Sequence, residues 1–124
     1  MGRKTMKRIL IADDEEALQR LYQEEFEEEG YEVILAGNGK EVLSRLEDPD
    51  HVPDIIVMDI RMPEMNGIDT LRAIKEKYPR MPVILCSAYS EFKQDFSVWA
   101  SDDYVVKSSD LTELKETVKK YLEE

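Results

Sequence analysis

The chain has 124 residues, of which 42% are hydrophobic and 36% are charged, so it can bury one core as a single globular domain. The formal net charge of −11 argues against direct binding of nucleic acid, which is itself a polyanion. No apolar run approaches the roughly 20 residues that a membrane-spanning helix needs, so we expect no membrane contact. Cys86 is the single cysteine, which excludes an internal disulfide and favours a cytoplasmic location.

Short apolar runs predict five buried strands, and the third of them organises the rest of the chain. The five runs cover residues 9–12, 33–36, 55–58, 83–86 and 104–106. The third run is uninterrupted and lies between two acids, Asp54 and Asp59. We therefore expect it at the centre of a sheet, with Asp59 at its carboxyl end.

Apolar residues at helical spacing predict a helix after each of the first two strands. The first helix carries Leu18, Tyr22 and Phe26 on one face, and Gly30 is expected to terminate it. The second helix is expected to begin at a capping box formed by Asn38 and Glu41.

Three further helices follow the remaining strands. Asn66-Gly67 opens the third, which ends before Pro79. A weaker helical pattern at 91–100 predicts the fourth. Asp110 and Glu113 again have the spacing of a capping box, ahead of a fifth helix that extends to Leu122.

Strict alternation of strands and helices predicts an α/β protein with a parallel sheet covered on both faces. Right-handed crossovers leave few arrangements of five such units. We expect the doubly wound, flavodoxin-like (βα)5 fold with strand order 2-1-3-4-5.

In this order the carboxyl ends of four strands meet at one crevice, and five chemically capable side chains follow or end those strands. They are Asp13, Asp14, Asp59, Ser87 and Lys107. Adjacent carboxylates repel one another unless a cation lies between them. Oxygen ligands from few side chains suit Mg²⁺, which keeps several water ligands. The sequence therefore predicts a magnesium site beside Asp59.

The residues at these strand ends resemble the receiver domain of two-component response regulators, in particular the single-domain chemotaxis receivers. The matching motifs are Asp13-Asp14, Met58-Asp59, Met62-Pro63-x-Met65-x-Gly67, Ser87-Ala88 and Asp103-Tyr104-Val105-Val106-Lys107. The resemblance extends from about residue 7 to residue 122, so we expect a lead-in at 1–6 and a receiver domain at 7–124.

The resemblance implies that Asp59 accepts a phosphoryl group in a Mg²⁺-dependent reaction. It further implies that Asp14, Asp59 and the backbone carbonyl of Arg61 bind the metal directly, with Asp13 acting through water. Such a domain is a signalling phosphoacceptor that assists its own phosphorylation and dephosphorylation, and not a dedicated enzyme.

The same resemblance assigns contacts to the phosphoryl group and a conformational switch. Lys107, Ser87 and Ala88 are expected to contact the phosphoryl oxygens, and Tyr104 to be the switch aromatic. Arg61 and Tyr89 lie two residues after Asp59 and Ser87, where family members flank the path of the attacking water. Both are bulky, so we expect slow self-dephosphorylation.

The implied partners are a sensor histidine kinase or a histidine phosphotransfer protein, and a downstream protein or a fused output domain. The signal is expected to leave through the face that the fourth helix, the fifth strand and the fifth helix form in the family.

Three departures from the family pattern lie near that face. Ser108 follows Lys107 where the family usually has proline, Ala100-Ser101 replaces a glycine, and the segment from Ser87 to Lys107 is shorter than usual. A cis bond costs about 0.5–1 kcal/mol before proline but roughly 2.5–4 kcal/mol before other residues. We therefore expect a trans bond at 107–108 and an irregular fourth helix.

Three alternatives need weighing against a receiver. A flavodoxin-like cofactor carrier would need a phosphate loop after the first strand, where Asp13-Asp14-Glu15-Glu16 would repel phosphate. A Mg²⁺-dependent hydrolase of the haloacid-dehalogenase type would need a D-x-D-x-[TV] pattern, which the first strand lacks. A degenerate receiver that serves only for docking would not require all five residues at the strand ends.

Overall fold

The computed structural model describes residues 6–88 and 100–123 and contains a five-stranded parallel sheet. The strand order is β2-β1-β3-β4-β5, so the predicted order is confirmed. The strands are β1 (Arg8–Ala12), β2 (Glu32–Ala36), β3 (Ile55–Met58), β4 (Val83–Ser87) and β5 (Asp103–Val106). They lie within a residue of the predicted runs.

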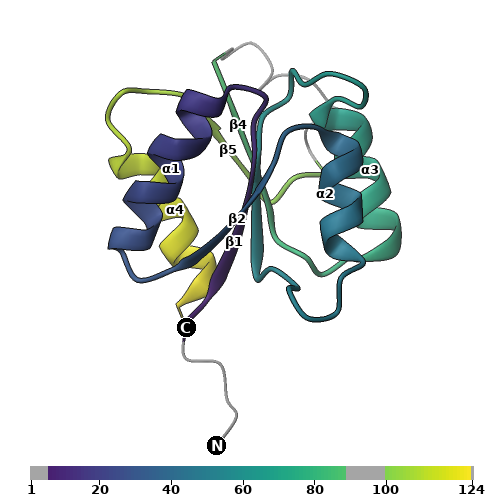
Figure 1. Ribbon diagram of the computed structural model, residues 1–124, viewed down its shortest axis with the longest axis horizontal. Coiled ribbons are helices and arrows are strands. Elements are labelled where there is room, and N and C mark those ends of the chain that lie inside the picture. Colours follow the sequence, from purple (N-terminus) through teal and green to yellow (C-terminus); the bar gives the residue numbers. More distant parts are fainter. Residues whose placement is uncertain (1–5, 89–99, 124) are drawn as a thin grey trace, which may run out of the picture.

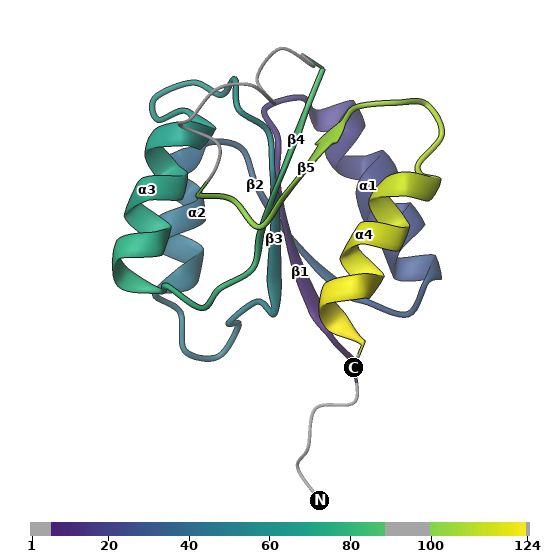
Figure 2. The same ribbon diagram turned by 180° about the vertical axis from the view of Figure 1, so that it is seen from behind.

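Two layers of helices cover the sheet. The helices are α1 (Glu16–Glu28), α2 (Gly39–Leu46), α3 (Gly67–Lys77) and α4 (Thr112–Leu122). Helices α1 and α4 lie against one face, and α2 and α3 lie against the other (Figures 1 and 2). The helix predicted at 91–100 falls, except for Ala100, outside the described residues.

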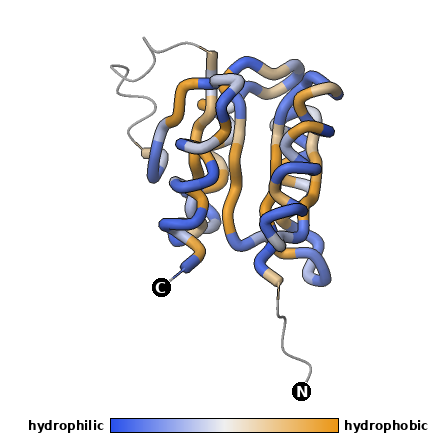
Figure 3. Tube along the Cα trace, turned by 90° about the vertical axis from the view of Figure 1, so that its left-hand side faces the viewer, coloured by the Kyte–Doolittle hydropathy of each residue, from blue (hydrophilic) through white to orange (hydrophobic). Residues whose placement is uncertain are grey.

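Alternate residues of each central strand supply the two halves of the core. In β1, Ile9 and Ile11 pack with the residues of α1 and α4, whereas Leu10 and Ala12 pack with those of α2 and α3. This alternation follows from the two-residue period of a strand. Hydrophobic residues accordingly follow the interior strands, and hydrophilic residues lie on the outer helix surfaces (Figure 3). No helix in the described ranges is long and apolar enough to cross a membrane.

The end of α1 confirms the stop signal predicted at Gly30. Gly30 has φ +97°, a left-handed conformation that costs glycine little. Its N–H donates to Glu27 O at 3.0 Å, and Tyr31 N–H donates to Phe26 O at 3.1 Å. The rings of Phe26 and Tyr31 lie 6.1 Å apart, which adds the apolar contact typical of this helix ending.

The starts of the helices bear out one capping prediction and correct another. Asn38 Oδ1 accepts from Glu41 N at 2.9 Å, which confirms the Asn38 half of the predicted capping box. The Glu41 side chain accepts from Gly37 N, one residue before the position that a capping box requires. The capping box predicted for Asp110 and Glu113 is wrong. Asp110 Oδ1 instead accepts from the backbone N and the hydroxyl of Thr112, two residues on, because α4 begins only at Thr112.

Candidate functional site

The carboxyl ends of β1, β3, β4 and β5 bring the predicted residues together at one edge of the sheet. Ala12 is paired with Met58, so Asp13 and Asp59 leave neighbouring strands side by side. Backbone hydrogen bonds extend the ladder past the strand ends: Asp59 N donates to Ala12 O at 2.9 Å, and Lys107 N donates to Ser87 O at 2.7 Å. The sheet itself therefore fixes the backbone beneath the site.

Lys107 bridges the two buried carboxylates. Its Nζ donates to Asp13 Oδ2 at 2.8 Å and to Asp59 Oδ2 at 2.9 Å. Asp13 is only 2% exposed and Asp59 only 8%, so both charges lie largely away from water. Charge-assisted hydrogen bonds of this length are the strong kind, and they hold one oxygen of Asp59 toward the ammonium.

Burial and charge act in opposite directions on these groups. Burial raises the pKa of Asp59 above its ordinary value, and the Lys107 ammonium only partly offsets this effect. Burial opposes the charged form of Lys107, but the hydrogen bonds that its ammonium donates to Asp13 and Asp59 outweigh this effect and raise the Lys107 pKa. Lys107 is therefore a permanent cation at the site.

The second oxygen of Asp59 is also oriented. Asp59 Oδ1 accepts from Ile60 N at 2.7 Å, while Gly67 N donates to Ile60 O at 2.7 Å. A Cβ atom at Gly67 would fall far inside van der Waals contact with Asp59 O. Glycine is thus required here so that α3 can begin directly against the end of β3.

The donor set fits a divalent cation. Carboxylate oxygens of Asp13, Asp14 and Asp59 all lie within 4.8 Å of one another. When ionised, these three acids and the Lys107 ammonium leave two negative charges uncompensated. Asp14 is exposed, so the cluster opens to solvent on that side, where Mg²⁺ could keep water ligands.

The remaining predicted residues lie around this cluster. Ser87 is fully buried at the end of β4, and Ala88 beside it is exposed. Tyr104 is half-buried and packs against the core beneath α2 and α3. Arg61 is exposed in the loop that follows β3, and Tyr89 lies outside the described residues.

The backbone after Lys107 also agrees with its prediction. No cis peptide bond occurs within the described ranges, so the Lys107–Ser108 bond is trans. Lys107 nevertheless reaches both carboxylates. Proline is therefore not needed at position 108 to direct the ammonium toward Asp59.

Sequence reasoning missed several supporting residues. Gln19 Nε2 donates to Asp13 O, and the Asp102 carboxylate accepts from Val83 N at 2.7 Å and from Lys75 Nζ at 2.9 Å. Gly39 is buried against the loop that follows β3. The contacts of Asp102 and Gly39 join residues distant in the chain, so no local pattern signals them. Gln19 is only six residues from Asp13, but its contact depends on how α1 folds back over the end of β1.

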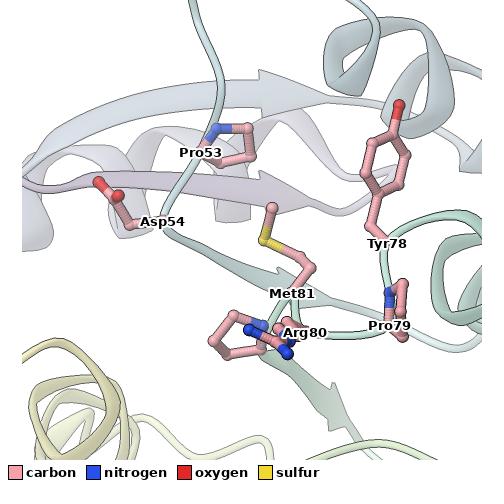
Figure 4. Close-up of a pocket in the computed structure, with 7 residues that line it drawn as sticks. Pro53, Asp54, Tyr78, Pro79, Arg80 and Met81 are labelled. Atoms are coloured by element: carbon pink, nitrogen blue, oxygen red, sulfur yellow. The ribbon is translucent and has the colours of Figure 1, made fainter.

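A separate apolar hollow lies at the opposite, amino edge of the sheet (Figure 4). Residues that precede β3 and β4, together with the end of α3, line it: Pro53, Asp54, Tyr78, Pro79, Arg80, Met81 and Pro82. It includes none of the acids at the carboxyl edge.

Cys86 is buried in the core below α1, and burial raises the pKa of its thiol to about 12, so the thiol stays protonated.

The family model of the response regulator receiver domain matches residues 9–119 of the chain. The chain belongs to this family. The receiver is 39% identical over 120 residues to the regulatory protein AtoC of Escherichia coli (strain K12). That match covers 95% of the receiver but only 26% of AtoC.

A second relative is similar in length to the receiver. Sporulation initiation phosphotransferase F of Bacillus subtilis (strain 168) is 32% identical over 118 residues, and the match covers 94% of each chain. Other curated relatives are longer, and the receiver spans about half of their length or less. Its match to the regulator PhoP of the same organism, for example, covers 48% of PhoP.

Among solved structures, the response regulator TrrA of Thermotoga maritima, in complex with Mg²⁺-BeF, has a TM-score of 0.89 and 44% identity. The match covers 94% of the receiver and 100% of that chain. TrrA in complex with the histidine kinase ThkA gives a TM-score of 0.87, covering 94% and 99% of the two chains. These similarities favour a receiver over a flavin carrier or a hydrolase.

Proposed function

We propose that Asp59 accepts a phosphoryl group from a phosphohistidine donor in a Mg²⁺-dependent reaction. The observation that carries the proposal is the Lys107 bridge, because it holds a permanent cation 2.9 Å from Asp59 Oδ2 in the midst of three acids. Phosphoryl transfer requires mainly positioning and neutralisation of the charge on the equatorial oxygens. The site offers both.

In the proposed step, an Asp59 carboxylate oxygen forms a bond to phosphorus as the bond from phosphorus to the imidazole nitrogen breaks. The electron pair of that bond stays on the imidazole, and Asp59 becomes an acyl phosphate. Lys107 Nζ and a hydroxyl or N–H from Ser87 and Ala88 donate to the phosphoryl oxygens. The ring of Tyr104 then moves with the Ser87 side chain, so Tyr104 acts as the conformational switch.

The metal residues are Asp14, Asp59 and the Arg61 backbone carbonyl, with Asp13 acting through water. Mg²⁺, when bound there, neutralises charge on the transferring phosphoryl group. The 4.8 Å cluster of carboxylate oxygens and its opening beside exposed Asp14 support this set. Arg61, together with Tyr89, would slow the approach of water and lengthen the life of the acyl phosphate.

The phosphoryl donor would be a sensor histidine kinase or a histidine phosphotransfer protein. The complex of TrrA with ThkA supports a kinase partner, and the length of AtoC supports an output domain or a separate downstream protein. The receiver domain would extend over 7–124, work in the cytoplasm, assist its own phosphorylation and dephosphorylation, and bind no nucleic acid itself. Its signal would leave through β5, α4 and the segment between β4 and β5.

The test is incorporation of phosphate from acetyl phosphate, measured by intact mass. Wild-type protein and an Asp50→Asn control should gain one phosphoryl group with Mg²⁺ and none with EDTA, since Asp50 is exposed, precedes the amino end of β3 and is not part of the cluster. Asp59→Asn should gain none. Equal incorporation by Asp59→Asn would reject the assignment.

A further inference from the structure

The first turn of α2 lies directly against the loop that follows Asp59. Gly39 N donates to Met65 O at 3.0 Å, across an interval of 26 residues in sequence that includes the whole of β3. A Cβ atom at Gly39 would lie 2.5 Å from Met65 O and 2.9 Å from Met65 Cβ. It would also fall inside contact distance of Thr70 Oγ1. Only glycine allows α2 and this loop to approach so closely.

The tip of the same loop has an uncommon backbone conformation. Glu64 has φ +65°, which is unfavourable for a residue with a side chain. Met65 N donates to Pro63 O at 2.6 Å, so the turn at the tip spans only three residues. A conformation of this kind persists only when surrounding contacts hold it.

Glycines hold this loop at two places, its base and its tip. At the base, Gly67 N donates to Ile60 O at 2.7 Å, directly beside Asp59. At the tip, Gly39 holds Met65, and the Lys40 ammonium lies 3.9 Å from the Glu64 carboxylate. The Lys40 pair is exposed and adds little. Gly39 is therefore the buried support of the tip.

We infer that Gly39 is a positioning residue for the metal site, which it stabilises by holding the loop from Arg61 to Asn66 in its strained shape. The inference rests on the proposed function, because that function assigns the Arg61 carbonyl to Mg²⁺. Loss of an outer support typically weakens metal binding roughly 10-fold or more. Gly39 is not among the residues assigned to the metal or to the phosphoryl group.

The first test compares three glycine variants by Mg²⁺ titration, followed through the amide NMR signals of Asp59 and Ile60. Gly39→Ala should weaken Mg²⁺ binding roughly 10-fold. Gly37→Ala should leave it unchanged, because a Cβ there meets nothing closer than Glu41 Oε1 at 3.6 Å. Gly30→Ala is the control for general destabilisation, because its φ of +97° makes alanine unfavourable at the distant end of α1.

The outcomes separate the inference from the proposed function. If wild-type protein shows no Mg²⁺-dependent shifts near Asp59, the proposed metal site itself is wrong. If wild-type protein binds Mg²⁺ and folded Gly39→Ala binds it equally well, only the positioning role is rejected. The same rejection follows if Gly30→Ala weakens binding as much as Gly39→Ala does.

A second test needs no variant and remains decisive if Gly39→Ala does not fold. Coupling between two sites is reciprocal, so Mg²⁺ must in turn strengthen the contact between Gly39 and Met65. Amide exchange at Gly39 should slow at saturating Mg²⁺ more than exchange at Glu41, whose N–H donates to the Asn38 side chain in the same turn. Equal slowing at both amides would overturn the inference.

Discussion

Replacing Lys107 with methionine removes the ammonium that separates two buried carboxylates but keeps a side chain of similar length. The side chains of Asp13 and Asp59 are 2% and 10% exposed, and that of Lys107 is 16% exposed. Removal of one partner from a buried ion pair costs roughly 3–5 kcal/mol. Because the cluster opens toward solvent at Asp14, we expect Lys107→Met to lower the free energy of unfolding by about 3 kcal/mol at neutral pH.

The loss of unfolding free energy in Lys107→Met should depend on pH in a defined direction. Without the ammonium, burial and the Asp13 carboxylate raise the pKa of Asp59 further above that of the unfolded chain. The folded variant then binds more protons than the unfolded chain, so its stability rises as pH falls toward the Asp59 pKa. The deficit relative to wild-type protein should therefore narrow as the pH falls from neutral toward the Asp59 pKa of the variant.

Urea denaturation followed by circular dichroism measures both effects. Lys119→Met is the matched control, because Lys119 is exposed on α4. It should change the free energy of unfolding by no more than about 0.5 kcal/mol. A loss below about 1 kcal/mol for Lys107→Met, or a deficit that does not vary with pH, would refute the reasoning.

Three further changes test other parts of the structure. Gly30→Ala should lower the free energy of unfolding by about 1 kcal/mol in a urea titration, because φ +97° is unfavourable for alanine; an unchanged midpoint would contradict the α1 ending described above. Gly67→Ala places a Cβ against Asp59 O and should cost more than Gly30→Ala, with shifted amide NMR signals at Asp59 and Ile60; a smaller cost would mean that the chain relaxes there freely. Asp14→Ala should remove Mg²⁺-dependent thermal stabilisation seen by calorimetry while leaving metal-free stability nearly unchanged, since Asp14 is exposed; retained stabilisation would exclude Asp14 as a ligand.

The fold could be predicted from the sequence because local and global signals agree. The apolar run at 55–58 is too short for a helix and is bounded by acids, and it forms β3, a strand buried along its whole length. Alternation of strands and helices then left one natural order, which the sheet has. The association of Asp13, Asp59 and Lys107 follows from that order, since parallel strands end at one edge.

The parts that could not be predicted depend on distances that no sequence pattern encodes. The close approach of Gly39 to Met65 depends on how α2 sits beside α3. The ion pair between Asp102 and Lys75 depends in the same way on packing between layers, because Asp102 directly precedes β5 in the sheet and Lys75 lies on α3. The spacing of Asp110 and Glu113 fits a capping box, but the chain turns at Asp110 and starts its helix two residues later.

The central claim, that Asp59 carries the phosphoryl group, is tested most directly by mapping the modified residue. The receiver would be treated with acetyl phosphate and Mg²⁺, reduced with borohydride to trap the acyl phosphate, and sequenced by tandem mass spectrometry. We predict one modified position, Asp59, and we expect this modification to be absent when EDTA replaces Mg²⁺. A stoichiometric label on any other residue, with Asp59 unmodified, would contradict the account.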